Sequence, residues 1–330
     1  MASIVDVAAR AGVSRQTVSN VLNAPDRVSL DTRRRVEEAI SALHYRPNRS
    51  AQNLRSQRSR LLGVDLASMG AHEVAPVLDR FVHALSEEAA RHGYHVLLFP
   101  RSGDAGATHL SLHETRTVDG FVLVDTERDD PRAHVLVAAG VPFVSFGRTG
   151  ESSTHDVVDV DGFAGGRAVA TELAASGRRR PAYVAWPEGS LTGDQRLAGF
   201  LAGCADAGID PADVPVLRRL NRVEDGVEAA LSLVEGRERP DAIATVSDLI
   251  AVGVIRGLRS FGVRAGDEVR VVGFDDAPMS AHLDPPLTTV RQPLDEVARR
   301  VVGRFLARLE DPDGPSVTEL LEPYLVVRRT

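Results

Sequence analysis

The sequence of 330 residues contains one cysteine, Cys204, and no lysine. A single thiol excludes a disulfide within the chain and a metal site built from several cysteines. No stretch of about 20 residues is uniformly apolar, which argues against a transmembrane helix. The N-terminus lacks the basic region and long apolar run of a secretory signal, so we expect a cytoplasmic protein with no membrane partner.

Motifs for catalysis are also missing. The ten histidines form no H-E-x-x-H or cysteine-histidine pattern, and no G-x-S-x-G precedes a histidine in a hydrolase arrangement. The stretch GFAGGR at 162–167 lacks the spacing of a phosphate-binding loop, and a turn that leads into a helix explains it better. We therefore expect no catalytic residue, no bound metal and no cofactor.

What is present is an uneven distribution of charge. Residues 1–60 carry 11 arginines and five acidic residues, whereas the remainder carries 28 arginines and 41 acidic residues. The net charges of the two parts, +6 and −13, add to the −7 of the chain. A basic head on an acidic chain is typical of a nucleic-acid-binding module joined to another domain. A solvated basic face is the alternative, but it is less expected over 60 residues.

Two short amphipathic helices are predicted near the N-terminus. The first is indicated by apolar residues at helical spacing, which are Ile4, Val7, Ala8 and Ala11. Gly12 can adopt the positive φ that ends this helix, and Ser14 can cap a second helix on which Val18, Val21 and Leu22 face inward. Two helices joined by such a turn form a helix-turn-helix, whose second helix can lie in the major groove of DNA.

The polar face of the second helix has residue types suited to DNA. Arg15 can donate two hydrogen bonds to guanine, and Gln16 and Asn20 can pair with adenine. Thr17 and Ser19 can form hydrogen bonds with phosphates. This face is therefore the candidate surface for recognising the DNA sequence. The alternative is a purely structural role, because many short helix pairs do not bind DNA.

The stretch SIVDVAARAGVSRQTVSNVLN, followed by YRPN at 45–48, resembles the DNA-binding head of the lactose repressor family of bacterial transcription factors. The family pattern is approximately T-x-x-D-V-A-x-x-A-G-V-S-x-x-T-V-S-R-V-L-N, and this sequence departs from it at Ser3 and Asn20. The resemblance implies that Arg15 and Gln16 are the main specificity pair. Asn20 is shorter than the usual arginine and uncharged, so we expect a different operator at the bases it faces. The predicted DNA-binding residues of the head are Ser14, Arg15, Gln16, Thr17, Ser19 and Asn20.

Residues 48–60 are polar and basic, without a core of their own, and a flexible linker is the simplest interpretation. The family resemblance implies instead a hinge that becomes helical on operator DNA, with matches at Asn48, Ala51 and Leu54. In the family, the leucine at the position of Leu54 enters the minor groove as an apolar wedge. Prying a base step apart costs about a few kcal/mol and is repaid by the bend that follows. The small Ala51 would let two hinge helices approach closely.

From Leu61 onward, short apolar runs alternate with amphipathic helices. Strands are predicted at 61–68, 94–100, 118–125, 141–147, 181–187, 241–247 and 269–276, and helices at 77–92, 165–176, 196–207 and 249–261. The alternation predicts an α/β core of two lobes, each a parallel, doubly wound sheet with helices on both faces. Ligands in this class bind beyond the carboxyl ends of the strands, which can face a shared cleft.

Motifs in the body carry the family resemblance over nearly the whole chain. They are RLAGF at 196–200, SDLIAVGVIRGL at 247–258, VVGFDD at 271–276, PPLTTVRQP at 285–293 and LVVRR at 325–329. The resemblance implies a core like the periplasmic sugar-binding proteins and assigns effector binding to Arg196 and Asp248. Their hydrogen-bonding groups suit a polyhydroxylated ligand, whereas a structural ion pair is the alternative.

Five further residues are candidates for the same cleft. Arg148 and Asp161 follow strands of the first lobe or its crossover, and Ser190 and Thr192 lie in the predicted loop before Arg196. Asn221 takes the place of an aromatic residue that several family members stack on the ligand.

These features predict three parts, a helix-turn-helix head at 1–47, a hinge at 48–60 and an effector-binding and dimerisation core at 61–330. The expected protein is a homodimeric regulator on a palindromic operator, and the family's usual outcome favours a repressor of carbohydrate genes controlled by a sugar-like effector. A solute-binding protein is the first alternative, but it would need export and has no use for a basic head. A sugar-processing α/β enzyme is the second.

Overall fold

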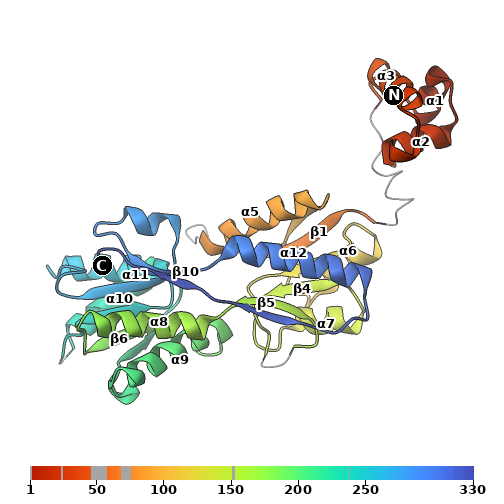
Figure 1. Cartoon of the computed structure of the whole chain (residues 1–330). Helices are drawn as coiled ribbons and strands as arrows, with labels where there is room; N and C mark the ends of the chain where they lie inside the picture. The colour runs from red at the N-terminus through yellow and green to blue at the C-terminus, as the bar shows by residue number, and fades with distance from the viewer. Residues whose placement is uncertain (1, 24, 46–57, 68–75, 151–152, 237) are drawn as a thin grey trace. The chain divides into compact units, whose positions relative to one another are not determined.

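The computed structural model describes residues 2–23, 25–45, 58–67, 76–150, 153–236 and 238–330. The chain divides into two compact units, Met1–Ser59 and Arg60–Thr330 (Figure 1). We describe each unit separately, the first as the head and the second as the core.

The head consists of helices α1 (Ile4–Ala11), α2 (Arg15–Asn23) and α3 (Leu30–Ala42), with a 3-10 turn at Pro25–Arg27. Ser3 and Asp6 cap α1 reciprocally, and Gly12 ends it with a φ of 64°. The Ser14 hydroxyl accepts the hydrogen bond from the Thr17 backbone N–H at 3.1 Å, as the predicted cap requires. The three helices pack against one another through small apolar side chains. These side chains are Val7, Ala8, Ala11, Val18, Val21, Val36 and Ala39.

The first lobe of the core has a six-stranded parallel sheet in the order β11-β5-β4-β3-β1-β2. Its strands are β1 (Leu61–Leu66), β2 (His95–Pro100), β3 (Gly120–Leu123), β4 (Phe143–Phe146), β5 (Asp156–Val160) and β11 (Thr318–Leu321). Helices α5 (Pro76–Arg91) and α12 (Leu294–Glu310) pack on one face, and α6 (Ala107–Glu114) and α7 (Pro131–Ala138) pack on the other. The near-continuous apolar strands are thus buried on both faces.

The second lobe has a sheet in the order β12-β10-β9-β8-β6-β7. Its strands are β6 (Pro181–Ala185), β7 (Val216–Arg218), β8 (Ala242–Thr245), β9 (Arg270–Asp275), β10 (Thr288–Arg291) and β12 (Tyr324–Val326). Its helices are α8 (Gly162–Ala175), α9 (Leu191–Asp206), α10 (Val223–Val234) and α11 (Asp248–Ser260), with 3-10 turns at Pro211–Asp213 and Pro278–His282. The chain crosses between the lobes near 161, 292 and 322.

The α/β fold class of the sequence analysis is confirmed, with one difference in the second sheet. Strand β12 pairs with β10 in the antiparallel direction, whereas every other pair among the described strands is parallel. Only residues 322 and 323 separate β12 from β11 of the first lobe. Strands β10 and β11 both run toward the cavity at their carboxyl ends, so a chain that continues directly from β11 into the second lobe runs away from the cavity and opposite to β10.

Two helices of the second lobe, α8 and α9, begin earlier than the sequence predicted. Helix α8 begins at Gly162 because the Asp161 carboxylate accepts a hydrogen bond from the Ala164 backbone N–H at 2.9 Å. Helix α9 begins at Leu191 because Ser190 caps it. None of the described helices has the length and apolarity needed to span a bilayer.

Candidate functional site

The exposed face of α2 carries the predicted base readers. Arg15 and Gln16 are exposed, while Ser19 and Asn20 are half-buried. The Gln16 side-chain amide donates a hydrogen bond to the Asn20 amide oxygen at 2.9 Å, one helical turn further on. The two amides therefore form one hydrogen-bonded unit. From the sequence they were predicted as separate base readers.

The side chains at the start of α2 are also paired. The hydroxyls of Ser14 and Thr17 lie 2.9 Å apart, so the cap and the predicted phosphate contact belong to one small network. The predicted hinge contacts Asn48, Ala51 and Leu54 lie outside the described residues.

The core contains a cavity of about 330 Å³ that both lobes line. It lies at the carboxyl ends of strands, where α/β proteins bind their ligands. Val124, Asp125 and Thr126 follow β3, Gly147 follows β4, and Trp186 follows β6. All five predicted residues of the second lobe line the cavity, and they are Ser190, Thr192, Arg196, Asn221 and Asp248.

Arg196 is the central cation of this cavity. It projects from α9, is only 4% exposed, and its guanidinium carbon lies 3.7 Å from the centre of the Phe274 ring. One guanidinium nitrogen donates to the Val246 carbonyl at 2.6 Å and to the Asp275 carboxylate at 3.2 Å. Its Nε has no hydrogen-bond partner among the described residues. A guanidinium held in this way is oriented before any ligand arrives.

The carboxylate that pairs with Arg196 is Asp275 rather than Asp248, the residue with which the sequence analysis grouped it. Asp275 ends β9 at the cavity wall and also accepts a hydrogen bond from the Gln292 side-chain amide at 2.7 Å. Burial raises the pKa of Asp275, and Arg196 opposes this shift. Its position at a strand end was the signal that could have identified it from sequence.

Asp248 lines the cavity but directs its carboxylate into the second lobe. One carboxylate oxygen accepts hydrogen bonds from the Ala277 backbone N–H at 2.8 Å and from the Ser280 hydroxyl, and the other accepts one from Thr289. The side chain is almost fully buried, and burial raises its pKa to about 7, with a further contribution from Asp275. These contacts make Asp248 a support for the turn after β9.

Two predicted residues, Arg148 and Asp161, do not line this cavity. Arg148 donates a hydrogen bond to the carboxylate of Asp159 at 2.9 Å, and Asp159 does line the cavity. One carboxylate oxygen of Asp161 caps α8.

The other predicted residues lie at the cavity wall. The amide oxygen of Asn221 accepts a hydrogen bond from the Ser247 hydroxyl at 2.6 Å. Ser190 is the cap of α9 and Thr192 lies in its first turn, not in a loop.

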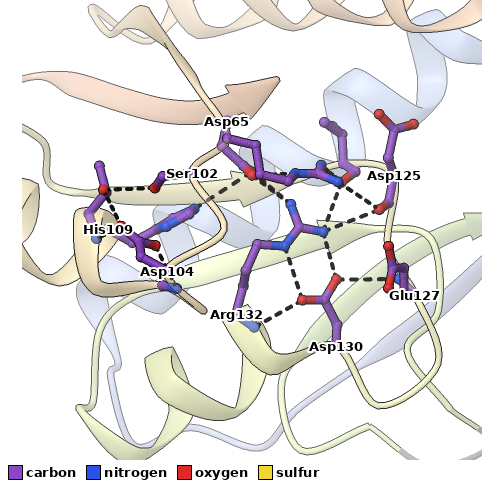
Figure 2. Close-up of polar contacts among 12 residues, drawn as sticks. Asp65, Ser102, Asp104, His109, Asp125, Glu127, Asp130 and Arg132 are labelled. Atoms are coloured by element: carbon purple, nitrogen blue, oxygen red, sulfur yellow. Dashed lines mark hydrogen bonds and ion pairs between the residues drawn. The ribbon is translucent and has the colours of Figure 1, made fainter. Parts of the chain in front are cut away.

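A buried charge cluster supports the wall of the first lobe (Figure 2). Asp65, in β1, accepts hydrogen bonds from Arg132 at 2.8 Å and from Arg101 at 2.7 Å. Burial opposes ionisation of Asp65, but His109 and the two arginines outweigh it and hold its pKa well below its usual range. This buried charge cluster, formed by Asp65, Arg101 and Arg132, was not predicted from the sequence. One acidic residue within a buried apolar strand was a signal for it.

In the described part of the chain, no group of three or more His, Cys, Asp or Glu could hold a metal ion.

A two-lobed cleft at strand ends, with a helix-turn-helix on the same chain, defines a ligand-binding DNA regulator. A model of the lacI family of bacterial regulatory proteins matches residues 3–48, and one of the periplasmic binding protein-like domain matches residues 170–330. The regulator CelR of Thermobifida fusca is 34% identical over 330 residues, covering 98% of this chain and 96% of CelR. The chain belongs to the LacI family, which confirms the resemblance seen in the sequence.

Further relatives agree with this assignment. The repressor PurR of Mannheimia succiniciproducens is 28% identical over 333 residues, covering 100% of this chain and 98% of PurR. Among solved structures, the CelR–cellobiose complex has a TM-score of 0.75 at 31% identity, covering 100% of this chain and 99% of the other. The lac repressor dimer bound to operator and the anti-inducer ONPF has a TM-score of 0.84 at 29% identity, covering 100% and 98%. These relatives are transcriptional regulators and repressors.

Proposed function

We propose that this protein is a sequence-specific repressor of carbohydrate-utilisation genes that binds a palindromic operator as a homodimer and is controlled by a saccharide. It acts by binding and without catalysis, in the cytoplasm, where its operator lies. The observation that carries the proposal is the strand-end cavity, in which Arg196 and Asp275 offer a donor and an acceptor side by side.

The lining of the cavity supports a saccharide as the effector. Hydroxyl groups both donate and accept hydrogen bonds, so they match the mixed set formed by Arg196, Asp275 and Gln292. The rings of Trp186 and Phe146 add apolar surface to the same cavity, which suits the apolar faces of pyranose rings. Because CelR has been solved with cellobiose, that disaccharide is the first candidate.

The operator contacts are assigned to α2. Arg15 and the joined amides of Gln16 and Asn20 are the proposed base readers, and Ser14, Thr17 and Ser19 contact phosphates. Asn48, Ala51 and Leu54 remain proposed hinge contacts. The solved lac repressor dimer on its operator supports a dimeric assembly here as well, because symmetric heads match symmetric half-sites.

The proposed control follows from the two lobes that line the cavity. A ligand that contacts Asp125 on one lobe and Arg196 on the other favours the arrangement in which both contacts are made. It changes operator affinity only as far as it binds the two arrangements differently. We expect cellobiose to release the operator.

The test is fluorescence anisotropy on a palindromic duplex selected from a random pool, with and without cellobiose. Arg15→Ala should lose about 1–3 kcal/mol of operator binding and retain cellobiose binding. Trp186→Ala should show the opposite, with cellobiose binding weakened at least about tenfold, since aromatic contact area is lost, and operator binding intact. Failure to select any duplex, or release that does not respond to cellobiose or another disaccharide, would contradict the proposal.

A further inference from the structure

In the first lobe, Asp125 lines the cavity two residues after the end of β3. Its carboxylate points away from the buried charge cluster, toward which its backbone carbonyl is turned (Figure 2). None of the described residues donates a hydrogen bond to this carboxylate, whereas the other acidic residues of the cavity all accept one or more from the protein, and they are Asp159, Asp248 and Asp275.

Asp125 is held in this position by the buried charge cluster. Its φ is 46°, a left-handed conformation that is uncommon outside glycine. Its carbonyl oxygen accepts hydrogen bonds from Arg132 at 3.2 Å and from Arg101 at 3.4 Å. Arg132 is itself fixed by Asp65 at 2.8 Å and by Asp130 at 2.6 Å. The backbone is therefore anchored from behind, and the side chain is left for the cavity.

The pairing of charges in the cavity makes Asp125 distinctive. The positive charge of Arg196 is matched by Asp275, and the negative charge of Asp159 is matched by Arg148. Among the described lining residues, Arg196 is the one cation, so no unpaired cation faces a ligand there. An anionic ligand would meet Asp125 without compensation, whereas a hydroxyl or an ammonium could donate to it.

We propose that Asp125 determines the charge selectivity of the effector site, accepting a hydrogen bond from a hydroxyl or ammonium of a saccharide and rejecting saccharides that carry a carboxylate or phosphate. The inference rests on the proposed saccharide effector and narrows its class to neutral and amine-bearing sugars. Arg132 and Asp65 are positioning residues in this scheme, because they act through the backbone of Asp125.

The experiment compares three β-1,4-linked disaccharides that differ in charge, by calorimetric titration of the full-length protein. They are cellobiose, the glucosamine dimer and cellobiuronic acid. For the wild-type protein we expect cellobiose and the glucosamine dimer to bind and cellobiuronic acid to bind much more weakly. Asp125→Asn keeps the shape and removes the charge, so it should shift the affinity ratio of the acid to the amine by at least about tenfold toward the acid. Cellobiose should change less than either.

Asp129→Asn is the matched control. Asp129 lies four residues further along the same loop, carries the same charge and also has a positive φ, but it does not line the cavity. It should leave the affinity ratio unchanged. An unchanged ratio in Asp125→Asn, or an equal change in both variants, would overturn this inference alone. Tight binding of the acid by the wild-type protein would do the same, and no binding of any of the three would overturn it together with the saccharide proposal.

Discussion

Arg196 shows how one side chain serves both the lobe and the cavity. It donates to the Val246 carbonyl, pairs with Asp275 and stacks on Phe274 while nearly fully buried. Its role as a cavity residue followed from the sequence, because RLAGF is a recognisable motif. Its partner Asp275 is 79 residues away in the chain, and only the folding of the second lobe brings the two together.

We expect Arg196→Met to destabilise the core by about 3–5 kcal/mol, because it leaves Asp275 buried without its cation. Adding Asp275→Asn should recover part of this loss, since the amide carries no charge to desolvate. Urea unfolding of the wild type, both single variants and the double variant measures the coupling. Strictly additive losses would contradict a direct ion pair.

Asp248 is the side chain for which a pH dependence is expected. Its pKa is raised to about 7 in the folded protein, from 3.8. Between these two values the folded state holds a proton that the unfolded state has released, so its contribution to stability falls as pH rises through this window. Above the folded pKa both states have lost the proton, and the dependence ends.

The measurement is the difference in unfolding free energy between wild type and Asp248→Asn, from pH 4 to pH 8. The wild type should lose stability relative to the variant by at most about 1.4 kcal/mol per pH unit up to about pH 7, and the difference should then level off. A difference that is flat below pH 7, or that grows in favour of the wild type, would show that Asp248 is ionised throughout.

Among the helices, close packing at glycine is the feature that shapes the second lobe. Helices α8 and α9 cross at Gly166, where an added Cβ would lie 2.1 Å from the carbonyl oxygen of Arg196. The helices can therefore approach only because a side chain is absent. Since α9 carries Arg196, this crossing also helps to set the position of the cavity's cation.

Gly166→Ala should destabilise the core by about 1–3 kcal/mol, because backbone must move to admit the methyl group. Gly303→Ala, in α12, is the control, since nothing lies within 4 Å of its added Cβ. It should stabilise by about 0.4–1 kcal/mol through reduced entropy of the unfolded chain. Thermal or urea unfolding checks both, and a neutral Gly166→Ala would contradict the close crossing.

For the molecule as a whole, the separation of charge predicts two different responses to salt. The operator-binding head is basic and the core is acidic, with 11 arginines against five acidic residues in the first 60 positions. Affinity for DNA depends on counterion release, whereas binding of the proposed neutral sugar at the buried Arg196–Asp275 pair should not.

Between 50 and 200 mM salt, operator affinity should therefore fall at least about tenfold, with a log-log slope of about −0.9 for each phosphate neutralised. Cellobiose affinity should change less than about twofold over the same range, because no net charge enters the cavity. Anisotropy and calorimetry measure the two. Equal salt dependence of both ligands would contradict this division of charge.

The amino-acid sequence alone was enough for the family, the fold class and the two helices of the helix-turn-helix, because these depend on local patterns. The cap at Ser14, the apolar strands and motifs such as VVGFDD are each recognised within a few neighbouring residues. Even the early starts of α8 and α9 are local, since Asp161 and Ser190 are ordinary capping residues.

Only the tertiary structure shows which charged side chains pair with one another. Pairing of Arg196 with Asp275, burial of Asp248 behind the cavity wall, and the clamp of Arg132 on Asp125 all join residues from separate elements. The reversed direction of β12 likewise follows from the return of the chain from the other lobe. Electrostatic interactions act through space and depend on burial, so a one-dimensional pattern shows which charges are present but not which of them meet.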